Sequence, residues 1–276
     1  MQSSESIHIY NENLKTYVFS STAQKSKATV LLIHGLGEHI RRYDEQINYF
    51  AEKGFSFAGA DLKGHGRSEG NRGVWNNVEE HYKVIDGVFN TAKEQNPNVP
   101  IFLYGHSMGG NLAAGYVLSR YPDISGLLLT GSAIKTSKDL PVPLVKMMLS
   151  APKFIQNIII SNGLNLKSLC NDPDIVDRYK KDPLVHDRIS LLAGATLLNN
   201  SFDILNTPFT SPYPVLIMHG KKDTITLPKG STALAAHWNG DITIKLWPGM
   251  LHEIHNEPEK KMVWDDMISW MNKALS

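Results

Sequence analysis

The sequence contains a single cysteine, Cys170, among 276 residues. One cysteine cannot form an intrachain disulfide, so the fold depends on packing, and such a count is typical of a reducing compartment. No stretch of about 18 apolar residues is present, so no membrane span is predicted. The first residues, Met1 to Ser6, carry no basic charge and precede no apolar segment of signal-peptide length. We therefore expect a soluble, cytoplasmic protein whose contact with membranes is at most peripheral.

The sequence also lacks an excess of charge of either sign, because it contains 28 Lys and Arg residues and 27 Asp and Glu residues. Without a basic excess, nothing in the composition points to nucleic acid as a partner. Phosphate-binding motifs are absent as well: no G-x-x-x-x-G-K-[ST] occurs, and no G-x-G-x-x-G opens a helix. No H-E-x-x-H or cysteine pair is present, and His252 and His255 share only H-x-x-H spacing. We predict no metal and no cofactor.

Hydrophobic residues make up 42% of the chain, enough for a substantial core. Short apolar runs recur, separated by stretches long enough for a helix, and they read as parallel strands buried on both faces. Such alternation predicts a doubly wound α/β sheet that binds its ligands at the carboxyl ends of the strands. The predicted strands are 29–33, 55–60, 101–104, 127–130, 215–218 and 242–246, and the predicted helices are 43–53, 78–95, the stretch from Gly110 to before Pro122, 231–236 and 262–274.

The alternation of strands and helices stops between about Ile134 and Thr196. Residues 140–160 are rich in Leu, Val, Ile, Met and Phe, and they show a two-faced helical pattern that Pro152 should split into two short helices. We read this segment as an inserted helical cap. The predicted organisation is a core over 1–135, a cap over 136–195 and a second part of the core over 196–276.

The first half of the cap has no acidic residue between Leu140 and Asn171, while Lys146, Lys153 and Lys167 supply positive charge. An apolar, mildly basic cap suits an acyl ester and contact with a membrane surface. We expect part of its apolar face to line the substrate tunnel, with the alternative that any single residue packs on the core instead. The candidates are Leu144, Met148, Ile155 and Ile158.

A nucleophilic serine is predicted in the sequence Gly105-His106-Ser107-Met108-Gly109. This G-x-S-x-G pattern follows a predicted strand and precedes a predicted helix, which is the context of a nucleophile elbow. The flanking glycines would remove side chains that otherwise clash across so sharp a turn. The alternative is a glycine-rich helix start without chemistry.

A serine nucleophile needs a base and a carboxylate that orients the base. On this type of fold the chain order should be serine, acid, histidine, with the acid and the histidine in loops after late strands. Asp223 and His252 occupy such loops. His255 is the competing base, and Asp241 is a competing acid that precedes its strand.

The developing oxyanion requires two backbone N–H donors. One is expected from Met108, which follows the nucleophile, and the other from Leu36 in the loop His34-Gly35-Leu36-Gly37. His34 itself is expected to brace this loop. The alternative is a simple strand-ending turn.

These motifs resemble the monoglyceride lipase and lysophospholipase-like branch of the α/β-hydrolases. The stretches that carry the resemblance include 34–43, 64–70, 219–223 and His252-Glu253. The resemblance implies an α/β-hydrolase fold, a Ser107–Asp223–His252 triad, an oxyanion hole formed by Leu36 and Met108, and a cap that admits an acyl chain. The expected activity is serine-dependent hydrolysis of monoacylglycerols, lysophospholipids or simple fatty esters. The alternatives are an aminopeptidase of the same fold and a non-catalytic binding protein on this scaffold.

Overall fold

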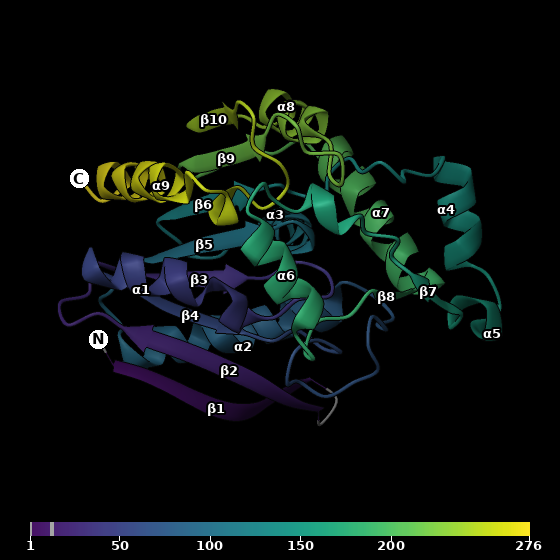
Figure 1. Ribbon diagram of the computed structural model, residues 1–276, viewed down its shortest axis with the longest axis horizontal. Coiled ribbons are helices and arrows are strands. Elements are labelled where there is room, and N and C mark those ends of the chain that lie inside the picture. The colour runs from purple at the N-terminus through teal and green to yellow at the C-terminus, as the bar shows by residue number, and fades with distance from the viewer. Residues whose placement is uncertain (1, 12–13) are drawn as a thin grey trace.

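The computed structural model describes residues 2–11 and 14–276, and its centre is an eight-stranded sheet with helices on both faces (Figure 1). The strand order is β1-β2-β4-β3-β5-β6-β9-β10. Neighbouring strands from β4 to β10 are parallel, whereas β1 and β2 are antiparallel to their neighbours. The strands are β1 (Gln2–Asn11), β2 (Leu14–Thr22), β3 (Ala28–Ile33), β4 (Phe55–Ala60), β5 (Ile101–His106), β6 (Gly126–Thr130), β9 (Val215–Gly220) and β10 (Ile242–Trp247).

Alternate residues of the strands feed two hydrophobic clusters, one on each face of the sheet. In β3, Leu31 and Ile33 pack toward one cluster and Val30 and Leu32 toward the other. This arrangement confirms the predicted doubly wound α/β sheet. The first cluster is covered by α2 (Glu79–Gln95), α3 (Met108–Arg120), α7 (Leu191–Asn206) and α8 (Pro228–His237), and the second by α1 (Asp44–Glu52) and α9 (Lys260–Ala274).

Both edges of the sheet differ from the prediction. The antiparallel pair β1–β2 was not predicted, because β1 is polar and mostly exposed and carries no continuous apolar run. The strand β10 was predicted to be buried on both faces, and that prediction was wrong. It is the last strand of the sheet and pairs on one side only, which leaves Ile244 40% exposed.

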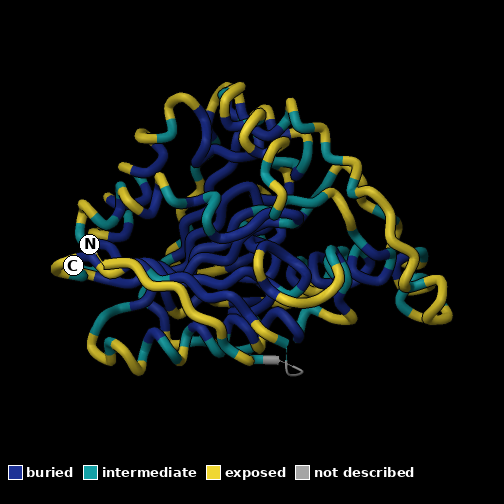
Figure 2. The backbone as a smooth tube through the Cα atoms, turned by 60° about the horizontal axis from the view of Figure 1, so that its bottom comes forward, coloured by how far each residue is buried: buried dark blue, intermediate teal, exposed yellow. Residues whose placement is uncertain are grey.

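The segment between β6 and β9 lies beyond the carboxyl ends of the parallel strands and projects from the core (Figures 1 and 2). Pro152 separates two short helices, as predicted. The helix α7 runs from this segment into the core, so residue 195 lies inside a continuous helix. The elements before α7 are α4 (Val142–Leu149), α5 (Lys153–Gln156), β7 (Ile159–Ser161), α6 (Pro173–Lys181) and β8 (Arg188–Ser190), and single 3-10 turns occur at Ile40–Tyr43, Leu166–Ser168 and Ile254–Asn256.

No helix within residues 2–11 and 14–276 has the length and apolar composition required to cross a lipid bilayer.

Candidate active site

Ser107 lies on a strained turn between the end of β5 and the start of α3. Its backbone has φ 54° and ψ −117°, a conformation that costs a non-glycine residue free energy. A Cβ on Gly105 would lie 2.3 Å from the Gly109 carbonyl oxygen, and a Cβ on Gly109 would lie 2.0 Å from that of Ile33. Both glycines are therefore required by crowding, which is the reason proposed from the sequence.

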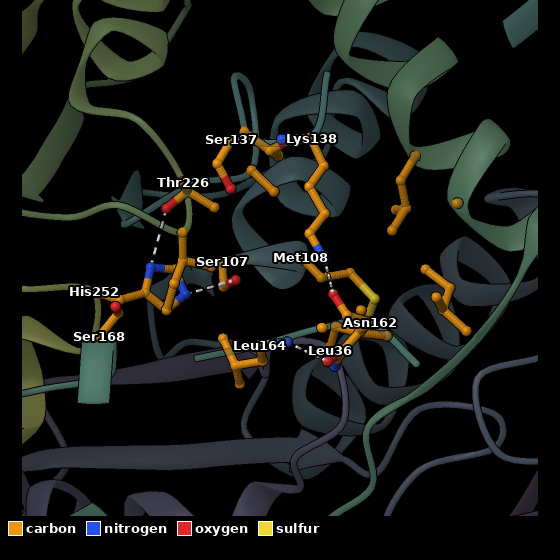
Figure 3. A pocket seen from close by; sticks show the side chains of 18 of the residues that line it. Leu36, Ser107, Met108, Ser137, Lys138, Asn162, Leu164, Ser168, Thr226 and His252 are labelled. Carbon is orange, nitrogen blue, oxygen red and sulfur yellow. Dashed lines mark hydrogen bonds between the residues drawn. The ribbon is translucent and has the colours of Figure 1, made fainter. Parts of the chain in front are cut away.

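The structure brings the three predicted side chains together at the carboxyl edge of the sheet, and Figure 3 shows two of them, Ser107 and His252. His252 Nε2 lies 2.9 Å from Ser107 Oγ, and His252 Nδ1 lies 2.7 Å from Asp223 Oδ2. A carboxylate only accepts hydrogen bonds, so Nδ1 carries the proton and the Nε2 lone pair faces the hydroxyl. Thr226 Oγ1 also lies within 3.0 Å of Nδ1, and this contact fixes the ring further. The imidazole is thus oriented to accept the proton of Ser107.

The two rival residues occupy other places. His255 is fully buried behind the site, where its ring stacks on Tyr43 at a centroid distance of 4.8 Å and packs edge-on against His106. Burial lowers the pKa of His255 to about 3, so it is neutral there. Asp241 precedes β10, and its carbonyl accepts the N–H of Val215 at the start of β9. Asp241 therefore lies at the opposite end of the sheet from Ser107.

A second histidine, which the sequence analysis treated as structural, also binds the Asp223 carboxylate. His219 Nε2 lies 2.9 Å from Asp223 Oδ2 and 2.9 Å from the carbonyl oxygen of Thr226. Because both neighbours are acceptors, Nε2 is the protonated nitrogen and donates, while Nδ1 accepts from the Ser231 hydroxyl at 2.7 Å. The spacing of four residues to Asp223 across a strand-ending turn was the available signal.

Charge interactions set the protonation states of the pair formed by Asp223 and His252. Burial alone would raise the pKa of Asp223, but His252 and the hydrogen bond from His219 outweigh it and lower that pKa. Burial alone would likewise lower the pKa of His252, but Asp223, with smaller contributions from Glu253 and Glu38, raises it above 6.5. Asp223 is therefore ionised and favours the imidazolium form of His252.

The loop that carries Leu36 is held by its own side chains. Leu62 N–H donates to His34 Nε2 at 2.9 Å, and His34 Nδ1 donates to the carbonyl oxygen of Gly35 at 2.8 Å, so His34 braces the loop as predicted. A Cβ on Gly35 would lie 3.2 Å from Ser107 Cβ, which shows how closely the loop approaches the serine. Among the described residues, no acceptor takes the N–H of Leu36 or that of Met108. Both donors are available at the site.

A buried ion cluster that the sequence analysis missed joins this loop to the loop of His252. Arg42 binds Glu253 in a bidentate pair with N–O distances of 2.7 and 2.9 Å, and it also contacts Glu38. Glu38 Oε1 accepts the N–H of Gly35 at 2.5 Å and the hydroxyl of Tyr43 at 2.7 Å. Glu253 directly follows His252. Through these contacts one guanidinium positions both loops.

A cavity of about 510 Å³ opens over Ser107, between the core and the cap segment. One part of its wall is apolar and is formed largely by the cap and α7. Another part is polar, and in Figure 3 Ser168 and Thr226 lie beside His252, whereas the contact between Lys138 and Asn162 lies next to Met108. Apolar lining residues include Leu36, Met108, Met148, Ile160, Ile189, Leu191, Leu197 and Leu198, and polar ones include Ser137, Lys138, Asn162, Asn165, Ser168 and Thr224.

Of the four cap residues predicted to contact substrate, Met148 lines this cavity and Leu144, Ile155 and Ile158 do not. The prediction extended one helical face through residue 158. The helix ends at Leu149 instead, and after Pro152 the chain turns so that Ile155 and Ile158 face solvent. Strand β7 places Ile160 at the cavity.

Among the described residues, no group of three or more His, Cys, Asp or Glu side chains is arranged to hold a metal ion.

Comparisons with known proteins agree with this geometry. Residues 24–259 match the Hydrolase_4 family, described as serine aminopeptidase, S33. A monoacylglycerol lipase of Mycolicibacterium smegmatis is 31% identical over 252 residues, which cover 90% of this chain and 89% of that protein. An abhydrolase domain-containing protein of Dictyostelium discoideum is 34% identical over 91% of this chain, which spans 27% of that relative's length.

Among solved structures, the crystal structure of the Paleococcus ferrophilus monoacylglycerol lipase superposes with a TM-score of 0.84 at 33% identity. The match covers 95% of this chain and 99% of that one. The α/β-hydrolase fold predicted from the sequence is confirmed. The chain belongs to the Hydrolase_4 family of α/β-hydrolases (serine aminopeptidase, S33), and it is a serine hydrolase similar to the monoacylglycerol lipases.

Proposed function

We propose that the protein hydrolyses carboxylic esters of acyl lipids, such as monoacylglycerols and lysophospholipids, through an acyl-enzyme on Ser107. Ser107 Oγ attacks the ester carbonyl while His252 accepts its proton, and the imidazolium then protonates the leaving alcohol. Water hydrolyses the acyl-enzyme with His252 acting again as base. The observation that carries the proposal is the chain of hydrogen bonds from Ser107 through His252 to Asp223, at 2.9 and 2.7 Å.

This assignment predicts the pH dependence of the reaction. His252 must be neutral to accept the proton of Ser107, and its pKa is raised above 6.5 even though burial opposes the shift, because Asp223 favours its charged form. The rate should therefore fall as the pH decreases through a value above 6.5, and this acidic limb belongs to His252 in the free enzyme.

We assign the oxyanion hole to the backbone N–H groups of Leu36 and Met108. Both donors lie beside Ser107 and have no acceptor among the described residues. Met108 is also the first residue of α3, so the positive end of the helix dipole adds to the stabilisation of negative charge. Donors that are fixed before the reaction stabilise the tetrahedral intermediate without further reorganisation.

The apolar part of the cavity favours an acyl chain over a polar acyl group. Each methylene buried there contributes about 0.8 kcal/mol, so a medium-length chain supplies several kcal/mol of binding. Relatives that match most of this chain carry the names monoacylglycerol lipase in Mycolicibacterium smegmatis and phospholipase in Bacillus subtilis. Monoacylglycerols and lysophospholipids are accordingly the first substrates to test.

An aminopeptidase of the same fold is the alternative within the family. That activity requires an unpaired carboxylate to hold the free amino group of a peptide. The carboxylates that line the cavity are Glu38 and Glu253, and both are bound to Arg42. With these charges neutralised, ester hydrolysis is the better-supported activity.

We also propose that the cap, over about 136–195, rests on a lipid surface when it collects substrate. Twelve large hydrophobic side chains are exposed among the described residues, and seven of them lie between 142 and 160, including Phe154 at 75%. Lys146 and Lys153 lie among them, and their charge suits anionic lipids. This exposed stretch belongs to the projecting segment in Figure 2 and borders the cavity at Met148 and Ile160.

The test is a hydrolysis screen with purified protein against monoacylglycerols, lysophosphatidylcholine, short aryl esters and proline anilide, combined with fluorophosphonate labelling. We expect turnover of the acyl esters, no turnover of the anilide, and labelling that is lost in Ser107→Ala. Labelling of Ser107→Ala equal to wild type would contradict the assignment of the nucleophile. Saturable binding of an acyl ester without turnover would instead favour the non-catalytic binding protein.

A further inference from the structure

We propose that the polar side of the cavity is a subsite for an anionic head group, so that monoacyl esters of glycerol phosphate are preferred over neutral monoacylglycerols. Lys138 is the residue that recognises the phosphate. This inference rests on the proposed function, because it names the alcohol that leaves from the acyl-enzyme step on Ser107.

The polar wall begins on the side where the leaving alcohol must be, and Lys138 extends from there across the cavity toward Met108 (Figure 3). His252 protonates that alcohol, so the head group departs next to His252. Two connections place Ser137 and Ser168, two residues of this wall, near His252. The N–H of Ser137 donates to the carbonyl of Ile225, and the next residue, Thr226, contacts His252. In addition, the backbone N–H of His252 donates to the backbone carbonyl of Ser168 at 3.4 Å.

Lys138 is distinguished from the other charged residues of the cavity by its partners. The charged lining residues besides histidine are Glu38, Arg42, Lys138 and Glu253. Arg42 is bound to both glutamates, whereas Lys138 donates to a backbone carbonyl, that of Asn162, at 2.6 Å. None of the described carboxylates pairs with Lys138, so its charge is not neutralised within the protein.

The local backbone allows the ammonium group to reach across the cavity. Lys138 comes from the segment after β6, and its side chain extends toward Asn162, next to β7 (Figure 3). A Cβ on Gly163 would lie 2.3 Å from Lys138 Nζ, and Gly163 has φ +59°. Any other residue there would therefore both strain the backbone and displace the ammonium.

The surroundings of Lys138 offer donors rather than competing anions. An ammonium has three donors, and hydroxyl or amide groups of Ser137, Asn165 and Thr224 line the same wall. The neighbouring acids are engaged elsewhere: Asp139 accepts from Thr136, and Asp187 accepts from Ser161. A phosphate oxygen bound here would replace the Asn162 carbonyl as acceptor and gain a charge-assisted hydrogen bond.

The experiment compares 1-octanoylglycerol 3-phosphate with 1-octanoylglycerol, both below the concentrations at which they form micelles, so that attraction to a lipid surface plays no part. We expect the wild type to favour the phosphate ester in kcat/KM. In Lys138→Met, which removes the charge but keeps an unbranched side chain one atom shorter, the ratio of the two kcat/KM values should fall about tenfold. Lys138→Arg should restore most of the ratio. The matched control is Lys180→Met, an exposed lysine of α6 away from the cavity.

Two results would overturn the subsite: an unchanged ratio in Lys138→Met, or an equal fall in Lys180→Met, which would indicate a general effect of net charge. Binding of glycerol 3-phosphate, measured by calorimetry, separates this inference from the proposed function. If neither ester is hydrolysed but glycerol 3-phosphate binds wild type and not Lys138→Met, the proposed function fails and the subsite stands. If both esters are hydrolysed and glycerol 3-phosphate binds both forms equally, the subsite fails alone.

Discussion

The loops around Ser107 and the cap segment differ in burial and in hydrogen bonding. Asp223 and His252 are almost completely buried, and each is held by several hydrogen bonds. The stretch 142–160 of the cap instead contains most of the exposed large hydrophobic side chains of the described residues. The core loops are therefore held in place by hydrogen bonds, whereas this stretch of the cap presents an exposed apolar surface.

This difference separates two tasks. Chemistry requires donors and a base that are positioned before the substrate arrives, and a buried network supplies that. Selection among acyl lipids requires apolar surface of suitable extent, which the lining residues of α7 and of the segment before it supply. Substitutions in the core loops should consequently lower the rate with every substrate, and substitutions in the cap should change the ranking of substrates.

The largest effect is expected for Asp223→Asn. The amide cannot stabilise the imidazolium, and it favours the wrong tautomer of His252, so kcat should fall about 10⁴-fold with every ester. Asp241→Asn is the matched control, because Asp241 is exposed and lies at the far end of the sheet. Steady-state kinetics check both variants, with thermal unfolding to verify folding. A loss below tenfold in Asp223→Asn would contradict the assigned role.

Removing the charge that joins the two core loops should strongly destabilise the fold. Arg42→Met leaves Glu38 and Glu253 buried without a cation, which costs about 3–5 kcal/mol in the free energy of unfolding. Arg41→Met is the control, since Arg41 is partly exposed and its ion pairs should contribute less than about 1 kcal/mol. Urea denaturation measures both. If Arg42→Met/Glu253→Gln is no more stable than Arg42→Met, the loss does not come from unpaired charge.

In the cap, Met148→Trp should change selectivity rather than chemistry. The larger ring would fill part of the apolar cavity and shorten the acyl chain that fits, so kcat/KM for dodecanoylglycerol should fall about tenfold relative to butyryl esters, a loss comparable to two buried methylenes. The neighbouring Met147 is 62% exposed and does not line the cavity, so Met147→Trp serves as the control. An equal loss of kcat/KM with both chain lengths in Met148→Trp would contradict the role of the cap in substrate selection.

A subtler test concerns His219, which donates a hydrogen bond to the same Asp223 oxygen, Oδ2, as His252. In His219→Leu the carboxylate loses a donor and attracts the His252 proton more strongly, so the acidic limb of kcat/KM should move to higher pH and kcat should fall about tenfold. His219→Gln retains an N–H donor and should remain closer to wild type. Identical pH profiles in all three proteins would reduce His219 to a packing residue.

The smallest effect concerns stability in acid. Burial lowers the pKa of His81 to about 4, and neither ring nitrogen has a hydrogen-bond partner among the described residues. The unfolded chain binds this proton near pH 6.5, so the free energy of unfolding decreases by up to about 1.4 kcal/mol for each pH unit between 6.5 and 4. Urea denaturation at pH 7 and pH 5 should show a loss about 1–2 kcal/mol smaller in His81→Leu. If the free energy of unfolding falls between pH 7 and pH 5 by the same amount in His81→Leu and in wild type, His81 is protonated in the folded protein.

The positions of Ser107, Asp223 and His252 were predictable because parallel strands carry their carboxyl ends to one edge. Each residue follows an apolar run that forms a strand, and the topology then brings the three loops together. Gly105 and Gly109 added a local signal, since only a tight turn requires them. The pattern of parallel strands was therefore sufficient to predict that these three side chains, distant in sequence, lie close together.

What escaped prediction depends on tertiary contacts. The pairing of Arg42 with Glu253 joins residues far apart in the chain, and nothing in local spacing indicates it. In the cap, the helical spacing was correct up to Leu149, but the direction of the chain after Pro152 decides which side chains reach the cavity. The polar strand β1 lacks the apolar pattern because it forms an exposed edge.

The central claim is that Ser107 carries the acyl group during turnover. The most direct measurement is rapid acid quenching during hydrolysis of p-nitrophenyl octanoate, followed by digestion and mass spectrometry of the peptides. The account predicts an octanoyl adduct on Ser107 that forms in the wild type and is absent from Ser107→Ala. Full turnover by Ser107→Ala, or an adduct on another residue of the wild type, would contradict it.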